Sequence, residues 1–215
     1  QGNIMPDAVS WSFKTPQTQD TPQQIIHTTV SDFATGQLDN TVITDDGDGA
    51  VSLRPSVSDT FDTPSLSSLW STTVWQPNGS VNVQNGAARL DGIGMFSAST
   101  WPSGQFVEFR AAFTGAPYQH IGFAQDMVNP SWAIFSTGDG GALLARTSNG
   151  AQTVNTVIPG SWLGQYHVFR IEWLSNQVLY YIDGKLEATH SIAISDNLRL
   201  AASDYVQDGS PVTID

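Results

Sequence analysis

Short stretches of alternating apolar and polar residues recur along most of this chain, and no segment shows the periodicity of a credible helix. Gly, Asn and Pro stand between these stretches, as they do between β-strands. About eleven short strands without a helix predict an all-β sandwich of two antiparallel sheets. The expected strands are residues 80–84, 87–90, 105–113, 118–125, 132–137, 142–147, 165–174, 177–182, 187–192, 199–204 and 211–215.

Two dipeptides predict where neighbouring strands are joined by tight hairpins. Asn85-Gly86 and Asp183-Gly184 each separate two expected strands. Asn-Gly and Asp-Gly are favoured in two-residue hairpin loops because both central positions need a positive φ. The register of these two hairpins is therefore the best-determined part of the predicted fold.

The net charge of the chain excludes some classes of binding partner. The sequence has 20 acidic residues, 17 of them Asp and 3 Glu, against 8 Lys and Arg, a net charge of -12. Such a chain repels phosphate backbones and anionic lipid, so nucleic acid and membrane surfaces are excluded as partners. No apolar stretch approaches the length of a membrane span, so membrane insertion is also excluded.

The first 57 residues differ from the regular pattern that follows them. Val9, Trp11 and Phe13 alternate with polar residues, which predicts a strand within 1–15 that has no partner beside it. Pro- and Gln-rich residues 16–24 are typical of a linker. Residues 25–57 form a β-rich segment, with short strands expected at 25–30, 41–43 and 50–53.

Four pieces of sequence resemble the concanavalin A-like sandwiches of the laminarinase and glucanase type. YHVFRIEWLSNQVLYYIDGKLEATH (166–190) resembles their signature, and three further pieces follow the same order: SDTFDTPSLSSLW (58–70) as the opening strand, GQFVEFRAAF (104–113) as a sheet strand and VTID (212–215) as the closing strand. The resemblance implies a lectin-like, concanavalin A-like jelly-roll sandwich over 58–215.

A second, shorter resemblance concerns the context of this domain. Residues 1–15 are similar to the last strand of an Ig-like domain of large bacterial surface proteins. This similarity implies an upstream Ig-like domain, so we expect a multidomain chain that is secreted or exposed at the cell surface. Neighbouring domains of the longer chain would then be among its partners.

The catalytic strand of the resembling glycosidases is not reproduced. Their Glu-x-Asp-x-x-Glu arrangement flanks the scissile bond with carboxylates, whereas SWAIFST (131–137) carries no acid. Asp126 and Asp139 lie only in the expected loops around this strand. We therefore expect a non-catalytic carbohydrate-binding or adhesion module whose partner is a polysaccharide or other glycan.

Two alternatives stay open at this point. One is a polysaccharide-degrading enzyme, a glycoside hydrolase or lyase with a non-standard site, in which Tyr118 and His120 exchange protons and Arg110 neutralises a uronate. The other is a structural spacer domain.

Aromatic and planar polar side chains are the candidate glycan ligands, because sugars stack on aromatic faces and accept paired hydrogen bonds. Glu108 and Arg110 lie two positions apart on one strand, so we expect them to form a pair on one face. The candidate set is Trp75, Glu108, Arg110, Tyr118, His120, Trp132 and Arg146.

The resemblance also implies a structural calcium ion. Related sandwiches hold this ion with an acid of the closing strand and with oxygen atoms near the opening strand and the first hairpin. The matching positions here are Asp59, Asp62, Gly86 and Asp215. Oxygen ligands of this kind suit Ca²⁺.

Overall fold

The computed structural model describes residues 31, 39, 41–43 and 51–215. The chain divides into two units, residues 1–58 and residues 59–215. In the first unit β1 (Thr41–Ile43) pairs antiparallel with β2 (Val51–Leu53), as expected for 41–43 and 50–53. The expected strands at 1–15 and 25–30 and the linker at 16–24 lie outside the described residues.

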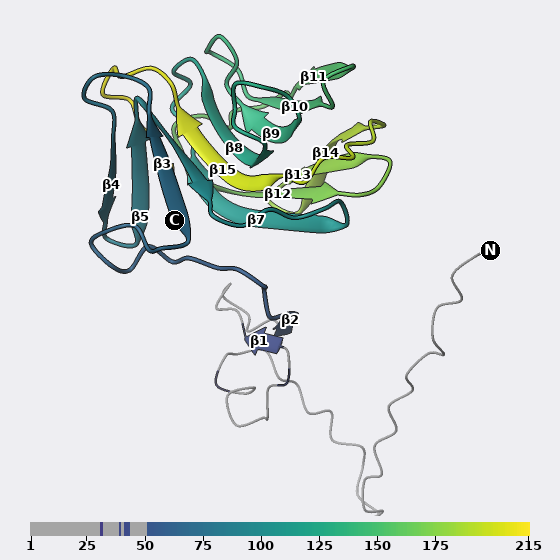
Figure 1. The fold of residues 1–215 in the computed structure, drawn as a ribbon, viewed down its shortest axis with the longest axis horizontal. Coiled ribbons are helices and arrows are strands. Elements are labelled where there is room, and N and C mark those ends of the chain that lie inside the picture. The colour runs from purple at the N-terminus through teal and green to yellow at the C-terminus, as the bar shows by residue number, and fades with distance from the viewer. Residues whose placement is uncertain (1–30, 32–38, 40, 44–50) are drawn as a thin grey trace, which may run out of the picture. The chain divides into compact units, whose positions relative to one another are not determined.

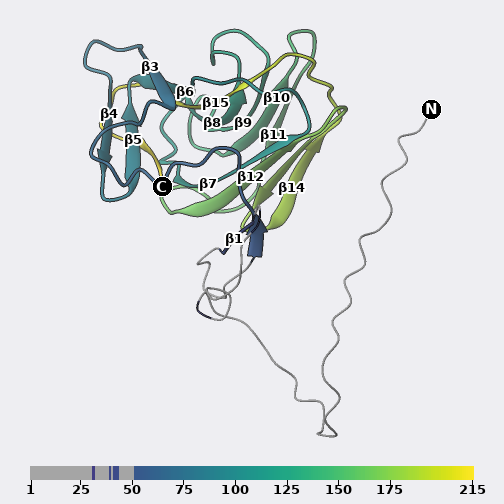
Figure 2. The same cartoon turned by 60° about the horizontal axis from the view of Figure 1, so that its bottom comes forward.

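The second unit is a sandwich of two antiparallel sheets, which Figures 1 and 2 show as stacked layers. The first layer, called the β8 sheet, has the order β11-β10-β9-β8-β15-β6-β3. Its strands are β3 (Trp70–Val74), β6 (Ile93–Ser97), β8 (Gln119–Ala124), β9 (Trp132–Ser136), β10 (Leu144–Ser148), β11 (Thr153–Val157) and β15 (Arg199–Asp204).

The second layer, called the β7 sheet, has the order β14-β13-β12-β7-β16-β5-β4. Its strands are β4 (Ser80–Gln84), β5 (Ala87–Asp91), β7 (Gln105–Ala112), β12 (His167–Trp173), β13 (Val178–Ile182), β14 (Lys185–His190) and β16 (Val212–Ile214). Residues 51–215 contain no helix. All eleven strands expected after residue 79 are confirmed, with ends that differ by up to two residues.

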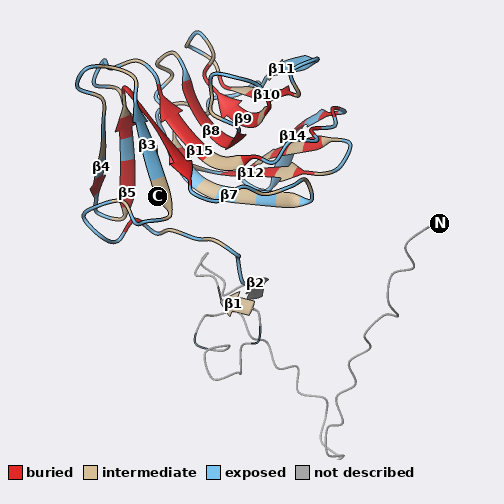
Figure 3. Ribbon diagram, viewed as in Figure 1, coloured by how far each residue is buried: buried red, intermediate tan, exposed pale blue. Residues whose placement is uncertain are grey.

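The core lies between the sheets and is rich in aromatic rings. Along β12, Phe169, Ile171 and Trp173 are fully buried, and the residues between them point away from the core. Phe169 packs on Phe135 across the sandwich, with ring centroids 4.9 Å apart. Figure 3 shows the contrast between β8, β9 and β15, which are buried along all or most of their length, and β7, whose outward residues are more exposed.

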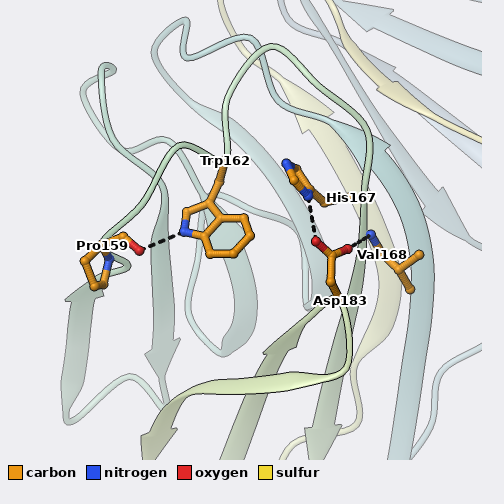
Figure 4. A network of polar contacts seen from close by, with 5 residues as sticks. All are labelled: Pro159, Trp162, His167, Val168 and Asp183. Atoms are coloured by element: carbon orange, nitrogen blue, oxygen red, sulfur yellow. Dashed lines mark hydrogen bonds and ion pairs between the residues drawn. The ribbon is translucent and has the colours of Figure 1, made fainter.

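Both predicted hairpins are confirmed. Asn85 and Gly86 have φ of 54° and 73°, and Asp183 and Gly184 have φ of 50° and 77°, as two-residue loops of this type require. The second loop is also anchored to β12, because Asp183 accepts hydrogen bonds from the Val168 N–H at 3.0 Å and pairs with His167 Nδ1 at 2.8 Å (Figure 4).

The prediction of an opening strand over 58–70 is wrong. The segment folds back on itself, and a strand begins only at Trp70. Asp59 explains the fold: its carboxylate accepts hydrogen bonds from Phe61 N–H at 2.9 Å, Ser67 Oγ at 2.8 Å and Trp70 Nε1 at 2.8 Å. An extended strand would separate Asp59 and Trp70 by about 36 Å, at roughly 3.3 Å per residue.

Candidate functional site

The outward face of the β8 sheet gathers aromatic and polar side chains from strands that are distant in sequence. Ile121, Phe123 and Phe135 point into the core, so the residues between them on β8 and β9 point outward. Strand pairing sets Ser136, His120, Ser203, Gly94 and Thr73 side by side in one row across five strands. The next row runs from Asn155 through Arg146, Ile134, Gly122 and Ala201 to Phe96 and Ser71.

Polar atoms on this face are left without partners although they are buried. His120 Nδ1, Ser203 Oγ and Trp132 Nε1 make no hydrogen bond to any residue that the structure describes. His120 and Ser203 are direct neighbours on paired strands. Because buried polar atoms are almost always satisfied, these three unpaired atoms set the face apart from an ordinary sheet surface.

The His120 imidazole is neutral at physiological pH. Burial lowers its pKa from 6.5 to about 3, and the positive charge of Arg146 adds to this effect. A neutral imidazole offers one N–H donor and one acceptor nitrogen. His120 can therefore hydrogen-bond a hydroxyl group, but it supplies no positive charge to the face.

Three aromatic rings form an arc along one side of the face. The Trp75 and Tyr205 ring centroids are 5.7 Å apart, and those of Tyr118 and Tyr205 are 6.0 Å apart. Tyr118 and Tyr205 are 40% and 49% exposed, so their rings are accessible to a ligand. Trp75 lies over Gly94, where an added Cβ would approach Trp75 to 2.9 Å and leave no room for the ring.

A pocket of about 340 Å³ opens beside Trp75. Phe96 contributes to its wall, and Phe96 belongs to a small apolar cluster with Ala124 and Ala201. Polar side chains share the wall with the rings, so the pocket combines a stacking surface with hydrogen-bonding groups. The pocket is lined by Thr73, Trp75, Phe96, Gln125, Asp126, Val128, Asn129 and Arg199.

Five of the seven sequence-predicted ligand residues are brought to this face or its edge: Trp75, Tyr118, His120, Trp132 and Arg146. Glu108 and Arg110 are not. They lie on β7 in the other sheet and are exposed on its outward side. The expected Glu108–Arg110 pair is also wrong, because Arg110 forms an ion pair with Asp215 and the guanidinium nearest Glu108 is that of Arg170, at 3.9 Å.

The sequence reasoning missed four further residues of the face: Phe96, Arg199, Ser203 and Tyr205. Residues 199, 201, 203 and 205 lie on one side of the β15 strand and its extension. This alternation was readable in the sequence. What was not readable is that β15 lies between β8 and β6, which carries Arg199 and Tyr205 to the same face as Trp75.

Asp126, an acid beside this face, is engaged within its own loop. Asp126 accepts hydrogen bonds from the Val128 and Asn129 N–H groups at 2.8 and 2.6 Å and so closes its own loop. Burial opposes ionisation of Asp126, but the hydrogen bonds from Asn129 and Val128 outweigh it and lower the pKa. A general acid needs the opposite shift.

Tyr118 and Asp139 form a second polar contact at the edge of the face. A side-chain hydrogen bond to Asp139, and then the Asp139 charge, raise the pKa of Tyr118. A raised pKa keeps the Tyr118 hydroxyl protonated, so it can return a proton but is a poor base. Arg110 is also absent from this face, so the lyase arrangement of Tyr118, His120 and Arg110 is not assembled.

The calcium residues are only partly brought together. Asp62 Oδ1 would lie 3.9 Å from a Cβ added to Gly86, and Asp215 follows β16, which pairs with β5 next to that hairpin. Asp59 and Asp215 are already engaged, the first by three donors and the second by Arg110. In the part of the chain that the structure describes, no three metal-binding side chains are grouped. The calcium site therefore stays a prediction.

Comparison with known proteins supports the fold at low sequence identity. No protein-family model and no curated protein sequence matches the chain. Among solved structures, a β-glucanase of Bacillus licheniformis is 14% identical with a TM-score of 0.54, and the match covers 73% of this chain and 92% of that one. The catalytic domain of an endo-1,3-β-glucanase (laminarinase) from Thermotoga petrophila is also 14% identical, with a TM-score of 0.51 and coverage of 73% and 92%.

A third neighbour is described as an immunostimulatory antigen and pseudo β-1,3-glucanase of Mycobacterium tuberculosis. It is 12% identical with a TM-score of 0.55, and the match covers 73% of this chain and 93% of that one.

Among the described residues, no helix is long and apolar enough to cross a membrane. The sandwich of this chain has the concanavalin A-like jelly-roll fold of the laminarinase and lichenase glucanases.

Proposed function

We propose that this chain is a non-catalytic carbohydrate-binding or adhesion module of a secreted, multidomain surface protein. The observation that carries the proposal is the outward face of the β8 sheet, where the arc of Trp75, Tyr205 and Tyr118 adjoins a pocket of about 340 Å³. Aromatic faces stack on the C–H surfaces of sugar rings, and nearby polar groups fix the hydroxyls.

The strand β9, which carries no acid, supports binding without turnover. β9 reads WAIFS, and Asp126 carries a lowered pKa within its own loop. The M. tuberculosis neighbour is described as a pseudo β-1,3-glucanase, in keeping with the principle that this fold does not by itself imply an active enzyme. The glucanase and laminarinase neighbours support a polysaccharide or other glycan as the partner.

A glycan array tests the proposal, and variants locate the site. We expect Trp75→Ala and Tyr205→Ala to weaken binding of the glycans that score by about two- to tenfold, the equivalent of roughly 0.5–1.4 kcal/mol. Phe106→Ala is the matched control, because Phe106 is 55% exposed on the other sheet. Melting curves confirm that each variant is folded.

Enzyme assays on the same glycans separate binding from turnover. Reducing-sugar and unsaturated-uronate assays should show no product with the wild type. Product formation by the wild type that is lost in His120→Ala would establish an enzyme instead. Absence of binding to every glycan of the array would favour a structural spacer.

A further inference from the structure

Arg146 stands on the outward face of the β8 sheet without an acidic partner. No carboxylate lies within ion-pair distance of it among the residues that the structure describes, although Arg110 and Arg170 on the other sheet both have one. The chain has 20 acids against 8 Lys and Arg, so an unpaired guanidinium is not a result of too few acids.

The Arg146 side chain is held in place by neutral groups. Nε donates to Asn155 Oδ1 at 2.9 Å, and Nη1 lies 3.5 Å from Ser136 Oγ. The guanidinium also sits 5.9 Å from the centre of the Trp132 ring. These contacts fix the group and leave Nη2 free of any hydrogen bond within the described residues.

The strands around Arg146 offer an unpaired donor and no outward acid. Trp132 Nε1, which can only donate, is buried without a partner among the described residues. The outward residues of β9, β10 and β11 include no Asp or Glu: they are Trp132, Ile134, Ser136, Leu144, Arg146, Ser148, Thr153, Asn155 and Val157. An unpaired N–H donor beside a fixed guanidinium matches an anionic oxygen group.

We infer that Arg146 and Trp132 form a subsite for a negatively charged substituent on the bound glycan, a carboxylate or a sulfate half-ester. This inference rests on the proposed carbohydrate-binding function. Arg146 and Phe96 lie in the same row with four strand spacings between them, about 19 Å at roughly 4.8 Å each. An oligosaccharide of several rings can therefore reach both this subsite and the pocket beside Trp75.

The net charge of the chain limits how much charge the ligand carries. With a net charge of -12 the protein repels a densely charged polyanion over long range, while the contact with Arg146 is local. His120 stays neutral down to a pH of about 3, so Arg146 is the one fixed positive charge of the subsite. The ligand is accordingly a largely neutral glycan with isolated acidic groups.

Matched pairs of oligosaccharides test the inference by calorimetry. One pair is a xylo-oligosaccharide bearing a single glucuronic acid and the same compound with its carboxyl group reduced to an alcohol. The second pair is a galacto-oligosaccharide bearing one sulfate and its desulfated form. We expect one acidic member to bind at least about tenfold more tightly than its neutral partner, as a charge-assisted, paired hydrogen bond implies.

Variants assign this preference to the residue. Arg146→Gln should abolish the preference for the acidic member, and Arg146→Lys should restore part of it because the charge returns without the planar fork. Arg89→Gln is the control, since Arg89 is exposed on β5 of the other sheet and should leave the preference unchanged. Melting curves check that each variant is folded.

The outcomes separate the inference from the proposed function. Equal binding of acidic and neutral members that is lost in Trp75→Ala would overturn the anion subsite and leave carbohydrate binding in place. A preference for the acidic member that persists in Arg146→Gln would also overturn the subsite. Absence of binding to these four probes and to every glycan of the array would overturn both.

Discussion

His120 illustrates how a single buried residue can link the candidate site to stability. Its pKa is lowered from 6.5 to about 3, first by burial and then by the Arg146 charge. Well above pH 6.5 the imidazole is neutral in both the folded and the unfolded protein and contributes no pH dependence. As the pH falls from 6.5 towards 3, only the unfolded protein takes up the proton, so stability is lost at about 1.4 kcal/mol per pH unit.

The first prediction at this scale is that His120→Gln removes that loss. Urea unfolding between pH 4.5 and 7.5 should give a difference between wild type and variant that is constant above about pH 7 and shifts against the wild type below pH 6.5. Ser203→Ala is the control, because it alters the neighbouring side chain without removing a titrating group. Parallel wild-type and His120→Gln profiles would show that His120 titrates alike in both states.

At the scale of the element, strands that alternate buried and outward residues were predicted, and so were β8 and β16, although they are buried at every position. β12 alternates buried and outward residues and was predicted to within two residues. Three strands were missed: β3, which is mostly exposed; β6, which is buried at every position; and β11, which is largely exposed at the end of its sheet. Alternation of apolar and polar residues indicates a strand with one solvent-exposed face. These three strands lack that alternation.

The candidate site was predictable in part for the same reason. Tyr118 and His120 fall within one expected strand, and their residue types drew attention to them, although Tyr118 lies in the turn before β8. Tyr205 and Phe96 belong to segments that reach the face only because β15 pairs with both β8 and β6. Pairing between segments far apart in the chain is set by the whole sheet and cannot be derived from any local pattern.

The segment that replaces the expected opening strand gives the prediction at this scale. Asp59 gathers three donors, and Asp59→Asn cannot accept all of them because its amide nitrogen only donates. A hydrogen bond of this partly exposed kind contributes about 0.5–1.5 kcal/mol, so we expect the melting temperature to fall by about 2–4 °C for each kcal/mol lost. Scanning calorimetry measures this shift.

Asp62→Asn is the matched control for Asp59→Asn. Asp62 is exposed and accepts a single hydrogen bond, from Thr60 Oγ1 at 2.6 Å, which an asparagine carbonyl can still accept. Its melting temperature should stay within about a degree of the wild type, because exposed substitutions of this kind change stability little. Equal effects of the two variants would contradict the anchoring role of Asp59.

At the scale of the whole molecule, the closing strand β16 ties the β7 sheet together, because it lies between β7 and β5. Asp215 follows this strand, and its carboxylate pairs with Arg110 on β7. The sequence resemblance assigned the same carboxylate to calcium, which stays a proposal. Arg110 and a calcium ion compete for this carboxylate, so the two arrangements predict opposite responses to chelation.

The last prediction follows from the ion pair that the structure shows. With Arg110 seated on Asp215, we expect EDTA to leave the melting temperature within a degree of its starting value. Arg110→Gln should lower it by at most about 2–4 °C, since an exposed ion pair contributes about 1 kcal/mol or less. A fall of several degrees on chelation, reversed by added Ca²⁺ and reduced in Asp62→Asn, would instead establish the calcium site, because a ligand that binds only the folded state at a hundred times its dissociation constant adds about 2.7 kcal/mol.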